Sequence, residues 1–376
     1  MEKFLALVDN LIALFLIFPL CCLFWRGSWD LVEFYIFPGR EPLCYWTMSA
    51  IGFCTVFNYL FLPIIDHHLN RQSHLYVPLS RLFLYFHSLL YMSFWRGVWG
   101  LYNYYLGTDW RWSLLHLCSS LCMMMTLKVL RTSYWPPLHI SVDRRPNLLI
   151  ASNRFKVNPS NKLLYIGDCF FSAIIVEGLS MLTWRSVINV MDSLIYPSDY
   201  LKSNIVCVIF GASGAIIMLF SQSLIAKVSG SLHNCSSLMR LLWEDIWCLL
   251  AFFFLSSLWR GGWNLNKVYF IPELPLGAWV NHILGLELLL LSQTFSCMSS
   301  FGILIDGDNT PGSPIFSTRY IRYFLDSPSD YDYSELENEA VVTANEGNED
   351  RDQSTDEYPQ VLPEIRHSIQ YNTFTN

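Results

Sequence analysis

Three ionisable residues lie deep inside long apolar runs of the sequence. Glu177 and Glu287 are each flanked by apolar stretches, and His87 has a similar setting in an earlier run. A charged side chain at the centre of a bilayer costs roughly 2.5–3.5 kcal/mol on insertion scales, so such residues normally face protein or water. These residue types suit a proton or ion path between helices. The structural alternative is a glutamate paired with a histidine, or hydrogen-bonded to Ser and Tyr, between packed helices.

Four arginines form a second candidate set, because each follows a tryptophan in a repeated motif. The motif WRGxW occurs three times, as WRGSW, WRGVW and WRGGW, and once in a decayed form, WRSVI. Its residues are Trp25, Arg26, Gly27, Trp29, Trp95, Arg96, Gly97, Trp99, Trp184, Arg185, Trp259, Arg260, Gly261 and Trp263. If the four arginines converged on one outer vestibule, they could bind an anion.

The motif also has a purely structural interpretation. Two tryptophans four residues apart share one face of a helix, and tryptophan is favoured at the membrane–water boundary. The arginine can lie over an indole ring or reach the headgroups, while glycine allows a neighbouring helix to approach closely. We therefore expect the motif to anchor the outer end of a helix at the interface. In the decayed copy Ser186 replaces the glycine and Ile188 the second tryptophan, so this outer end should pack differently.

No arrangement of residues indicates catalysis or a bound metal or cofactor. The sequence contains no Walker loop, GxGxxG, HExxH or GxSxG motif, so we predict no catalytic residues and a non-enzymatic protein. The stretch Asp66, His67 and His68 lacks further ligands at helical spacing and is interpreted as a solvated helix end rather than a metal site. A nucleic-acid-binding patch is not expected either.

The composition requires a lipid solvent for most of the chain. Hydrophobic residues make up 53% of the 376 residues and charged residues only 15%, against roughly 25% charged in soluble domains. Apolar runs long enough to cross a bilayer are Phe4–Phe24, Leu43–Ile65, Val77–Phe94, Ser113–Leu130, Leu163–Trp184, Asn204–Ala226, Leu241–Trp259 and Leu276–Ile305. We predict an all-α membrane domain over residues 1–307, with eight transmembrane helices arranged as four tandem hairpins, 4–65, 77–130, 163–226 and 241–305.

The distribution of basic residues predicts the orientation. Most of the 24 lysines and arginines fall in the termini and the even-numbered loops, which places both termini in the cytosol. The basic loop 131–162 then lies on the cytosolic face, where Arg144, Arg145, Arg154 and Lys156 are expected to attract anionic lipid.

The cytosolic tail begins at residue 308. Thirteen of the 31 acidic residues lie from Asp326 onward, and the basic residues there are Arg351 and Arg366. Because this stretch is acidic and has no apolar periodicity, we expect it to be disordered from about residue 326.

With its WRGxW hairpins, decayed third copy, helix count and cytosolic tail, the chain resembles the fuseless family of eight-pass membrane proteins of invertebrates. The resemblance covers roughly Leu11 to Gly307. It implies a presynaptic plasma-membrane protein that organises voltage-gated calcium channels at active zones and supports synaptic transmission. It supplies no catalytic residues.

Two hypotheses about function follow from these observations. In the first, the protein positions or stabilises partner membrane proteins through its helix surfaces and acidic tail, with presynaptic calcium channels as the partners implied by the resemblance. In the second, it is a small-solute or ion transporter or channel whose path is lined by Glu177, Glu287, His87 and the four motif arginines. A transporter needs Glu177 and Glu287 in a water-accessible cavity, whereas an organising protein only needs them hydrogen-bonded.

Overall fold

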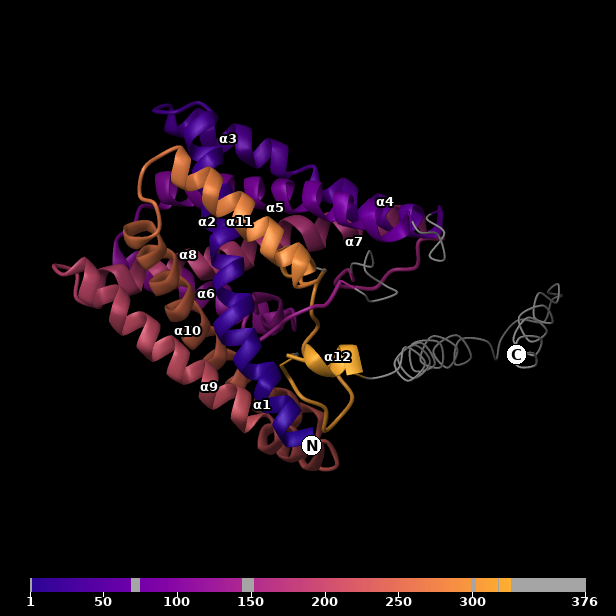
Figure 1. Cartoon of the computed structure of the whole chain (residues 1–376). Coiled ribbons are helices and arrows are strands. Elements are labelled where there is room, and N and C mark those ends of the chain that lie inside the picture. The colour runs from indigo at the N-terminus through magenta and orange to yellow at the C-terminus, as the bar shows by residue number, and fades with distance from the viewer. Residues whose placement is uncertain (1, 69–74, 144–151, 299–301, 317, 326–376) are drawn as a thin grey trace, which may run out of the picture. The chain divides into compact units, whose positions relative to one another are not determined.

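The structure is a computed structural model that describes residues 2–68, 75–143, 152–298, 302–316 and 318–325 (Figure 1). Helices dominate, and no β-strand occurs in these ranges. The elements are α1 (Glu2–Ile12), a π-helical turn (Ala13–Ile17), α2 (Phe18–Tyr35), α3 (Glu41–Gly52), α4 (Thr55–His68), α5 (Tyr76–Leu106), α6 (Trp110–Thr126), α7 (Lys162–Phe170), a second π-helical turn (Phe171–Val176), α8 (Glu177–Leu194), α9 (Tyr200–His233), α10 (Ser237–Tyr269), α11 (Leu276–Leu291) and α12 (Ile321–Leu325). The prediction of an all-helical protein is therefore confirmed.

Four continuous helices are long and apolar enough to cross a membrane. They are Phe4–Tyr35, Lys162–Leu194, Tyr200–His233 and Ser237–Tyr269, and α11 is a shorter apolar helix. The prediction of eight spans stays a prediction. All residues from Asp326 onward lie outside the described residues. The disorder predicted for the tail therefore stays a prediction.

Two predicted spans have the wrong shape. The run Leu43–Ile65 is divided into α3 and α4 by a turn at Phe53 and Cys54. In the run Leu276–Ile305 the α-helix ends at Leu291, Gln293 takes a positive φ of 55°, and a short 3-10 helix follows at Phe295–Met298. The apolar residues that follow are part of the protein interior rather than of a longer helix.

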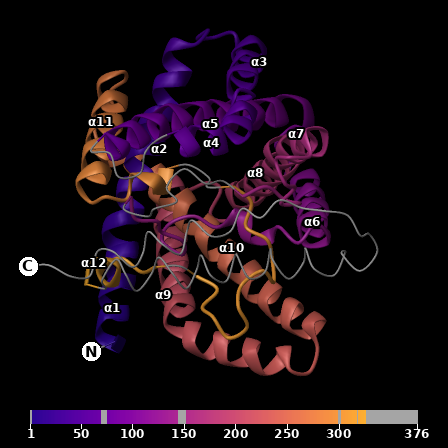
Figure 2. The ribbon, with the colours of Figure 1, turned by 90° about the vertical axis from the view of Figure 1, so that its right-hand side faces the viewer.

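The four motif-bearing helices α2, α5, α8 and α10 form an inner ring. Each contacts the next along the chain, and α10 contacts α2, which closes the ring. The remaining long helices pack outside it. As both views show, α3 lies beside α5 and α9 beside α10 (Figures 1 and 2). In the same way α6 packs on α8 and α11 on α2.

The predicted hairpins describe the chain order but not the packing. Each outer helix packs most closely on the inner helix that follows it, and α11 returns to the first inner helix. The two helices of a predicted hairpin share few or no contacts in the part of the chain that the structure describes. The helical hairpin is therefore wrong as the packing unit.

Glycine explains this choice of partners. A Cβ atom on Gly27 would lie 2.3 Å from the backbone nitrogen of His282 on α11. One on Gly97 would lie 2.4 Å from the backbone nitrogen of Ser49 on α3. A Cβ on Gly261 would lie 2.7 Å from the backbone carbonyl oxygen of Asn204 on α9. Helix backbones approach this closely only where no side chain intervenes. The motif glycines thus fix which outer helix packs on α2, α5 and α10.

The third copy uses hydrogen bonds where the others use glycine. Between α8 and α6, Thr183 Oγ1 donates to Ser120 Oγ at 2.9 Å, and Asn189 Nδ2 donates to Ser113 Oγ at 3.3 Å. Ser186 stands in the glycine position and is fully buried. The expectation that this copy packs differently agrees with these contacts.

The segment after α6 folds into the bundle instead of remaining in a surface loop. Two buried carboxylates hold it: Asp306 accepts from the backbone N–H groups of Leu130 and Arg131 at 2.7 and 2.9 Å, and Asp143 accepts from the Ser296 N–H at 2.8 Å. Burial raises the pKa of Asp306 to about 6, although these N–H groups and the Arg131 charge lower it. Burial likewise raises the pKa of Asp143.

Candidate functional site

The first tryptophans of the four motif copies form a closed ring at the centre of the inner helices. The ring centroids of Trp25 and Trp95 are 5.8 Å apart. Trp95 to Trp184, Trp184 to Trp259 and Trp259 to Trp25 are each 6.4 Å apart, all with the edge of one ring toward the face of the next. Edge-to-face contact at this distance is favourable for aromatic side chains. We call these four residues the lower ring.

A second aromatic layer, the upper ring, lies one helical turn further along. Trp29 contacts Trp99 at 6.0 Å and Trp263 at 5.5 Å, again edge to face. In the decayed copy the corresponding residue is Ile188. The upper ring therefore has three indoles and one aliphatic side chain, and it is incomplete at α8.

Trp135 closes the other side of the lower ring. Its ring centroid lies 5.1 Å from that of Trp25, 6.2 Å from that of Trp95 and 6.4 Å from that of Trp259. The indole N–H of Trp259 donates to the carbonyl oxygen of Pro136 at 2.9 Å and holds the segment in place. Trp135 is thus the floor of the layers above it.

These layers enclose a cavity of about 230 Å³, the tryptophan cavity. Its lining residues are Trp25, Trp29, Trp95, Trp99, Trp135, Trp184, Ile188, Asp192, Trp259, Arg260, Trp263 and Asn264. The lower-ring tryptophans are only 5–7% exposed, while those of the upper ring are half-buried and Asp192 is exposed. Exposure therefore increases toward the ends of the inner helices, which identifies that side as the mouth.

This geometry corrects the interfacial interpretation of the motif. Each inner helix continues for ten or eleven residues beyond its first motif tryptophan, to Tyr35, Leu106, Leu194 and Tyr269. At 1.5 Å per residue the motif lies about 15 Å before the helix end. The first tryptophans contact one another edge to face and are buried in the protein interior, so they do not lie at the end of the helix.

The motif arginines do not converge on one vestibule. Arg96 Nη2 lies 3.2 Å from Glu33 Oε1 on α2. Arg185 of α8 donates through Nε to Asn103 Oδ1 of α5 at 2.8 Å and through Nη2 to the Gly107 carbonyl oxygen. Arg96 and Arg185 thus each join their helix to the preceding inner helix, and the motif arginines have separate partners instead of one shared anion site.

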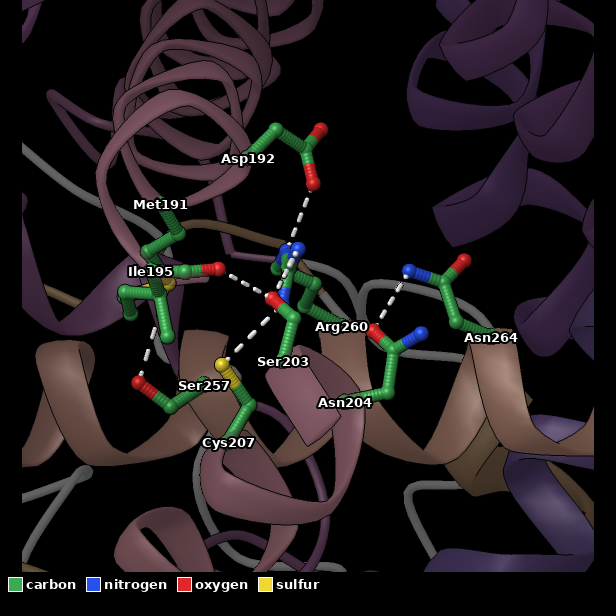
Figure 3. A network of polar contacts seen from close by, with 9 residues as sticks. All are labelled: Met191, Asp192, Ile195, Ser203, Asn204, Cys207, Ser257, Arg260 and Asn264. Atoms are coloured by element: carbon green, nitrogen blue, oxygen red, sulfur yellow. Dashed lines mark hydrogen bonds and ion pairs between the residues drawn. The ribbon is translucent and has the colours of Figure 1, made fainter. Parts of the chain in front are cut away.

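Arg260 repeats this arrangement at the mouth of the cavity. Figure 3 shows its guanidinium between α8 and α9, with Nε 2.7 Å from Asp192 Oδ1 and Nη2 3.0 Å from Ser203 Oγ. Its Nη1 donates to Cys207 Sγ at 3.1 Å. All three guanidinium nitrogens are therefore committed to protein partners.

The partners follow a rule in the repeat. Glu33, Asn103 and Asp192 each lie eight residues after the first tryptophan of their own copy, and the equivalent residue of the fourth copy is Lys267. Lysine cannot pair with Arg26, which instead lies 2.6 Å from its own helix neighbour Asp30 and over the ring of Trp263. The ring of polar contacts thus changes at the α10–α2 junction.

The intramembrane polar candidates lie apart from the tryptophan cavity. Glu177 is buried and accepts a hydrogen bond from the Tyr91 hydroxyl at 2.7 Å. His87 is buried, with Nδ1 2.7 Å from Asn58 Nδ2. Glu287 is exposed on α11. None of the three lines the cavity, and Glu177 and Glu287 do not share a site.

The basic-loop residues have local partners where the structure describes them. Lys156 Nζ lies 2.6 Å from Asp308 Oδ2, both exposed, and Arg154 lies over the ring of Phe155 at 5.3 Å. Arg144 and Arg145 fall outside the described residues. Among those described, no group of three or more His, Cys, Asp or Glu residues could hold a metal ion.

Sequence reasoning missed two parts of this site. Trp135 lies in a loop assigned to the cytosolic face, and no motif in the sequence marks it as buried. Asp192 carries no motif of its own. Only its register, eight residues after Trp184, relates it to Glu33.

The fold and site define a class: an all-helical protein with long apolar helices, built from four inner helices around a tryptophan-lined cavity. The Fuseless family model matches residues 4–299, and the chain belongs to the Fuseless family. No curated protein sequence matches the chain, and neither does any solved structure.

Proposed function

We propose that the chain is a non-enzymatic, multi-pass plasma-membrane protein that organises partner membrane proteins. Both termini lie in the cytosol in this proposal. The partners suggested by the family resemblance are presynaptic voltage-gated calcium channels, so the protein supports synaptic transmission at the presynaptic terminal.

The outer surface of α9 is the observation that carries the proposal. Large apolar side chains are exposed along one helix that is long enough to cross a membrane, among them Ile209, Phe210, Ile217, Phe220 and Leu224. Such a surface contacts lipid or the apolar face of another membrane helix. Arg96, Arg185 and Arg260 meanwhile each bond to the preceding inner helix, which suits a supporting framework.

Calcium-channel density at active zones tests the proposal. In neurons lacking the protein, we expect fewer channels and less evoked transmitter release, with both restored by the full chain. A Phe210→Ala, Ile217→Ala double variant should restore less, because it removes apolar volume from the α9 surface. The control is Leu82→Ala, Phe86→Ala, which removes exposed apolar side chains from α5. Normal channel density in neurons without the protein would refute the proposal.

The rival transporter or channel has less support in the form predicted from sequence. Its path needed Glu177, Glu287, His87 and the arginines together, yet Glu287 is exposed on α11 and the arginines are bonded to separate partners. Ion current and solute uptake in liposomes, compared between the unmodified protein, Glu177→Gln and Glu287→Gln, test it directly. Flux that both variants abolish would replace the organising role with transport.

A further inference from the structure

The tryptophan cavity remains unused by an organising role, and its chemistry indicates a ligand. Indole faces carry negative electrostatic potential and attract cations, most of all those that are poorly hydrated. Here indole rings from four helices and a loop line one space of about 230 Å³. Aromatic enclosures of this kind suit the quaternary ammonium group, whose charge is spread over methyl groups that fit an apolar wall.

The charges at the mouth favour a cation over an anion. The side chain of Arg260 is only 4% exposed and has each of its nitrogens hydrogen-bonded, whereas the Asp192 side chain is 50% exposed. An anion would have to displace those bonds. A cation meets the solvent-facing carboxylate directly, because Asp192 is the exposed member of this ion pair.

The decayed third copy makes the mouth. In the other three copies a tryptophan occupies the upper-ring position, and Ile188 takes this position in α8. The indole missing here leaves the cavity bordered by Ile188 and Asp192 on the same helix. At this edge the smaller Ile188 and the exposed acid Asp192 lie four residues apart on α8, and both line the cavity.

Two buried donors add a requirement on the ligand. The indole N–H groups of Trp25 and Trp184 have no hydrogen-bond partner among the described residues, and both side chains are 5% exposed. A ligand oxygen near the ammonium group could accept from them. At roughly 30 Å³ per water molecule the cavity holds about eight water-sized groups, close to the size of choline.

We propose that the tryptophan cavity binds a small oxygen-bearing quaternary ammonium group of the choline type, which enters beside Ile188 and Asp192. The same chemistry is present in free choline and in the headgroup of phosphatidylcholine. By the predicted orientation the mouth lies toward the outer membrane face, where it can meet free choline or a phosphatidylcholine headgroup.

Equilibrium binding of radiolabelled choline to the purified full-length protein tests the proposal. The protein is held in nanodiscs of phosphatidylethanolamine and phosphatidylglycerol, so that no lipid choline competes. We expect saturable binding that tetramethylammonium displaces. The uncharged isostere 3,3-dimethylbutan-1-ol should need at least about tenfold higher concentration, because it has the same shape without the charge. Equal displacement by the isostere, or no binding to folded protein, overturns the proposal.

Two variants locate the site. Ile188→Trp restores the residue that the other copies carry, fills the mouth, and should lower choline affinity at least about tenfold. Asp192→Asn keeps an oxygen for Arg260 Nε and should lower affinity several-fold through loss of charge alone. Thermal unfolding of each variant confirms folding, and a folded Ile188→Trp variant with unchanged affinity would place the binding elsewhere and overturn the proposal.

Nanodiscs of phosphatidylcholine distinguish the two sources. If the headgroup is the ligand, these discs should reduce apparent affinity for free choline, and native mass spectrometry should find phosphatidylcholine retained by the unmodified protein but not by Ile188→Trp. If free choline is the ligand, affinity should be the same in both lipids. The measurement uses no calcium channel, so its result is independent of the organising role.

Discussion

The Nε atom of Arg260 on α10 lies 2.7 Å from Oδ1 of Asp192 on α8, with the arginine buried and the aspartate half exposed. The same reach from one inner helix to the preceding one recurs at Arg96 and Glu33, and at Arg185 and Asn103. The motif arginines thus link the second, third and fourth copies each to the copy before it. The arginine performs this link, and the tryptophans form the centre.

Removing the carboxylate of Asp192 should destabilise the fold, because it leaves Arg260 buried without its charged partner. We expect Asp192→Ala to cost about 1–3 kcal/mol of unfolding free energy. The matched control is Asp308→Ala, since Asp308 is similarly exposed and lies 2.6 Å from Lys156, which is itself exposed. That variant should cost less than about 1 kcal/mol. Chemical denaturation of both in detergent measures the difference, and equal losses would contradict the argument.

The glycine contacts predict a strong dependence on position. Gly97→Ala would put a Cβ atom 2.4 Å from the backbone nitrogen of Ser49, so α3 and α5 must separate. We expect a loss of about 1–3 kcal/mol from overpacking. Gly167→Ala on α7 meets no atom within 4 Å and should be neutral or stabilise by up to about 1 kcal/mol. Thermal unfolding compares the two. Similar melting temperatures would show that the close approach is not required.

Trp135 should contribute more to stability than a tryptophan on the outer surface. Trp135→Ala removes the floor of the tryptophan cavity and should cost about 3–5 kcal/mol, as expected for truncating a buried aromatic residue. Trp112 is exposed on α6, and Trp112→Ala should change the unfolding free energy by less than about 0.5 kcal/mol. Denaturant titrations followed by circular dichroism test this pair. A small effect of Trp135→Ala would mean that the segment after α6 adds little to the core.

Asp306 should make stability depend on pH. Its folded-state pKa is raised to about 6 by burial, from a usual value of 3.8. The folded state therefore holds the proton more tightly than the unfolded state. Stability should fall as pH rises from about 4 to about 6, by about 2–3 kcal/mol if this group acted alone.

Asp306→Asn cannot titrate and isolates this contribution. It should be less stable than the unmodified protein at pH 4, because asparagine offers only one side-chain oxygen to the two N–H groups of Leu130 and Arg131, whereas Asp306 offers two. The deficit should shrink as the unmodified protein ionises toward pH 6.5. Unfolding free energies measured at several pH values give the difference, and a constant deficit would exclude titration of Asp306 in this range.

Hydropathy and repetition were sufficient to predict a large part of this architecture. Apolar runs of the right length indicated helices, and those around Trp25, Trp95, Trp184 and Trp259 are helical in the structure. The decay of the third copy was also visible, because Ser186 and Ile188 stand where the other copies have glycine and tryptophan. The family match confirms the resemblance that these residues suggested.

The side of the helix that the tryptophans face could not be predicted from the motif. A tryptophan beside an arginine at the end of an apolar run is typical of a membrane boundary, and the same spacing also fits a ring in the core. The contacts of Gly27, Gly97 and Gly261 with α11, α3 and α9 decide between them. These contacts join residues far apart in the chain, where a single sequence carries no pairing signal.

The apolar and repeated sequence alone determined the helices, the motif copies and the position of the irregular third one, because each depends on residue type and local spacing. Tertiary structure decided the closure of α11 onto α2, the insertion of Trp135 beneath the lower ring and the pairing of Asp192 with Arg260. Those features depend on close packing between distant segments, and the tryptophan cavity exists only where four helices and one loop meet.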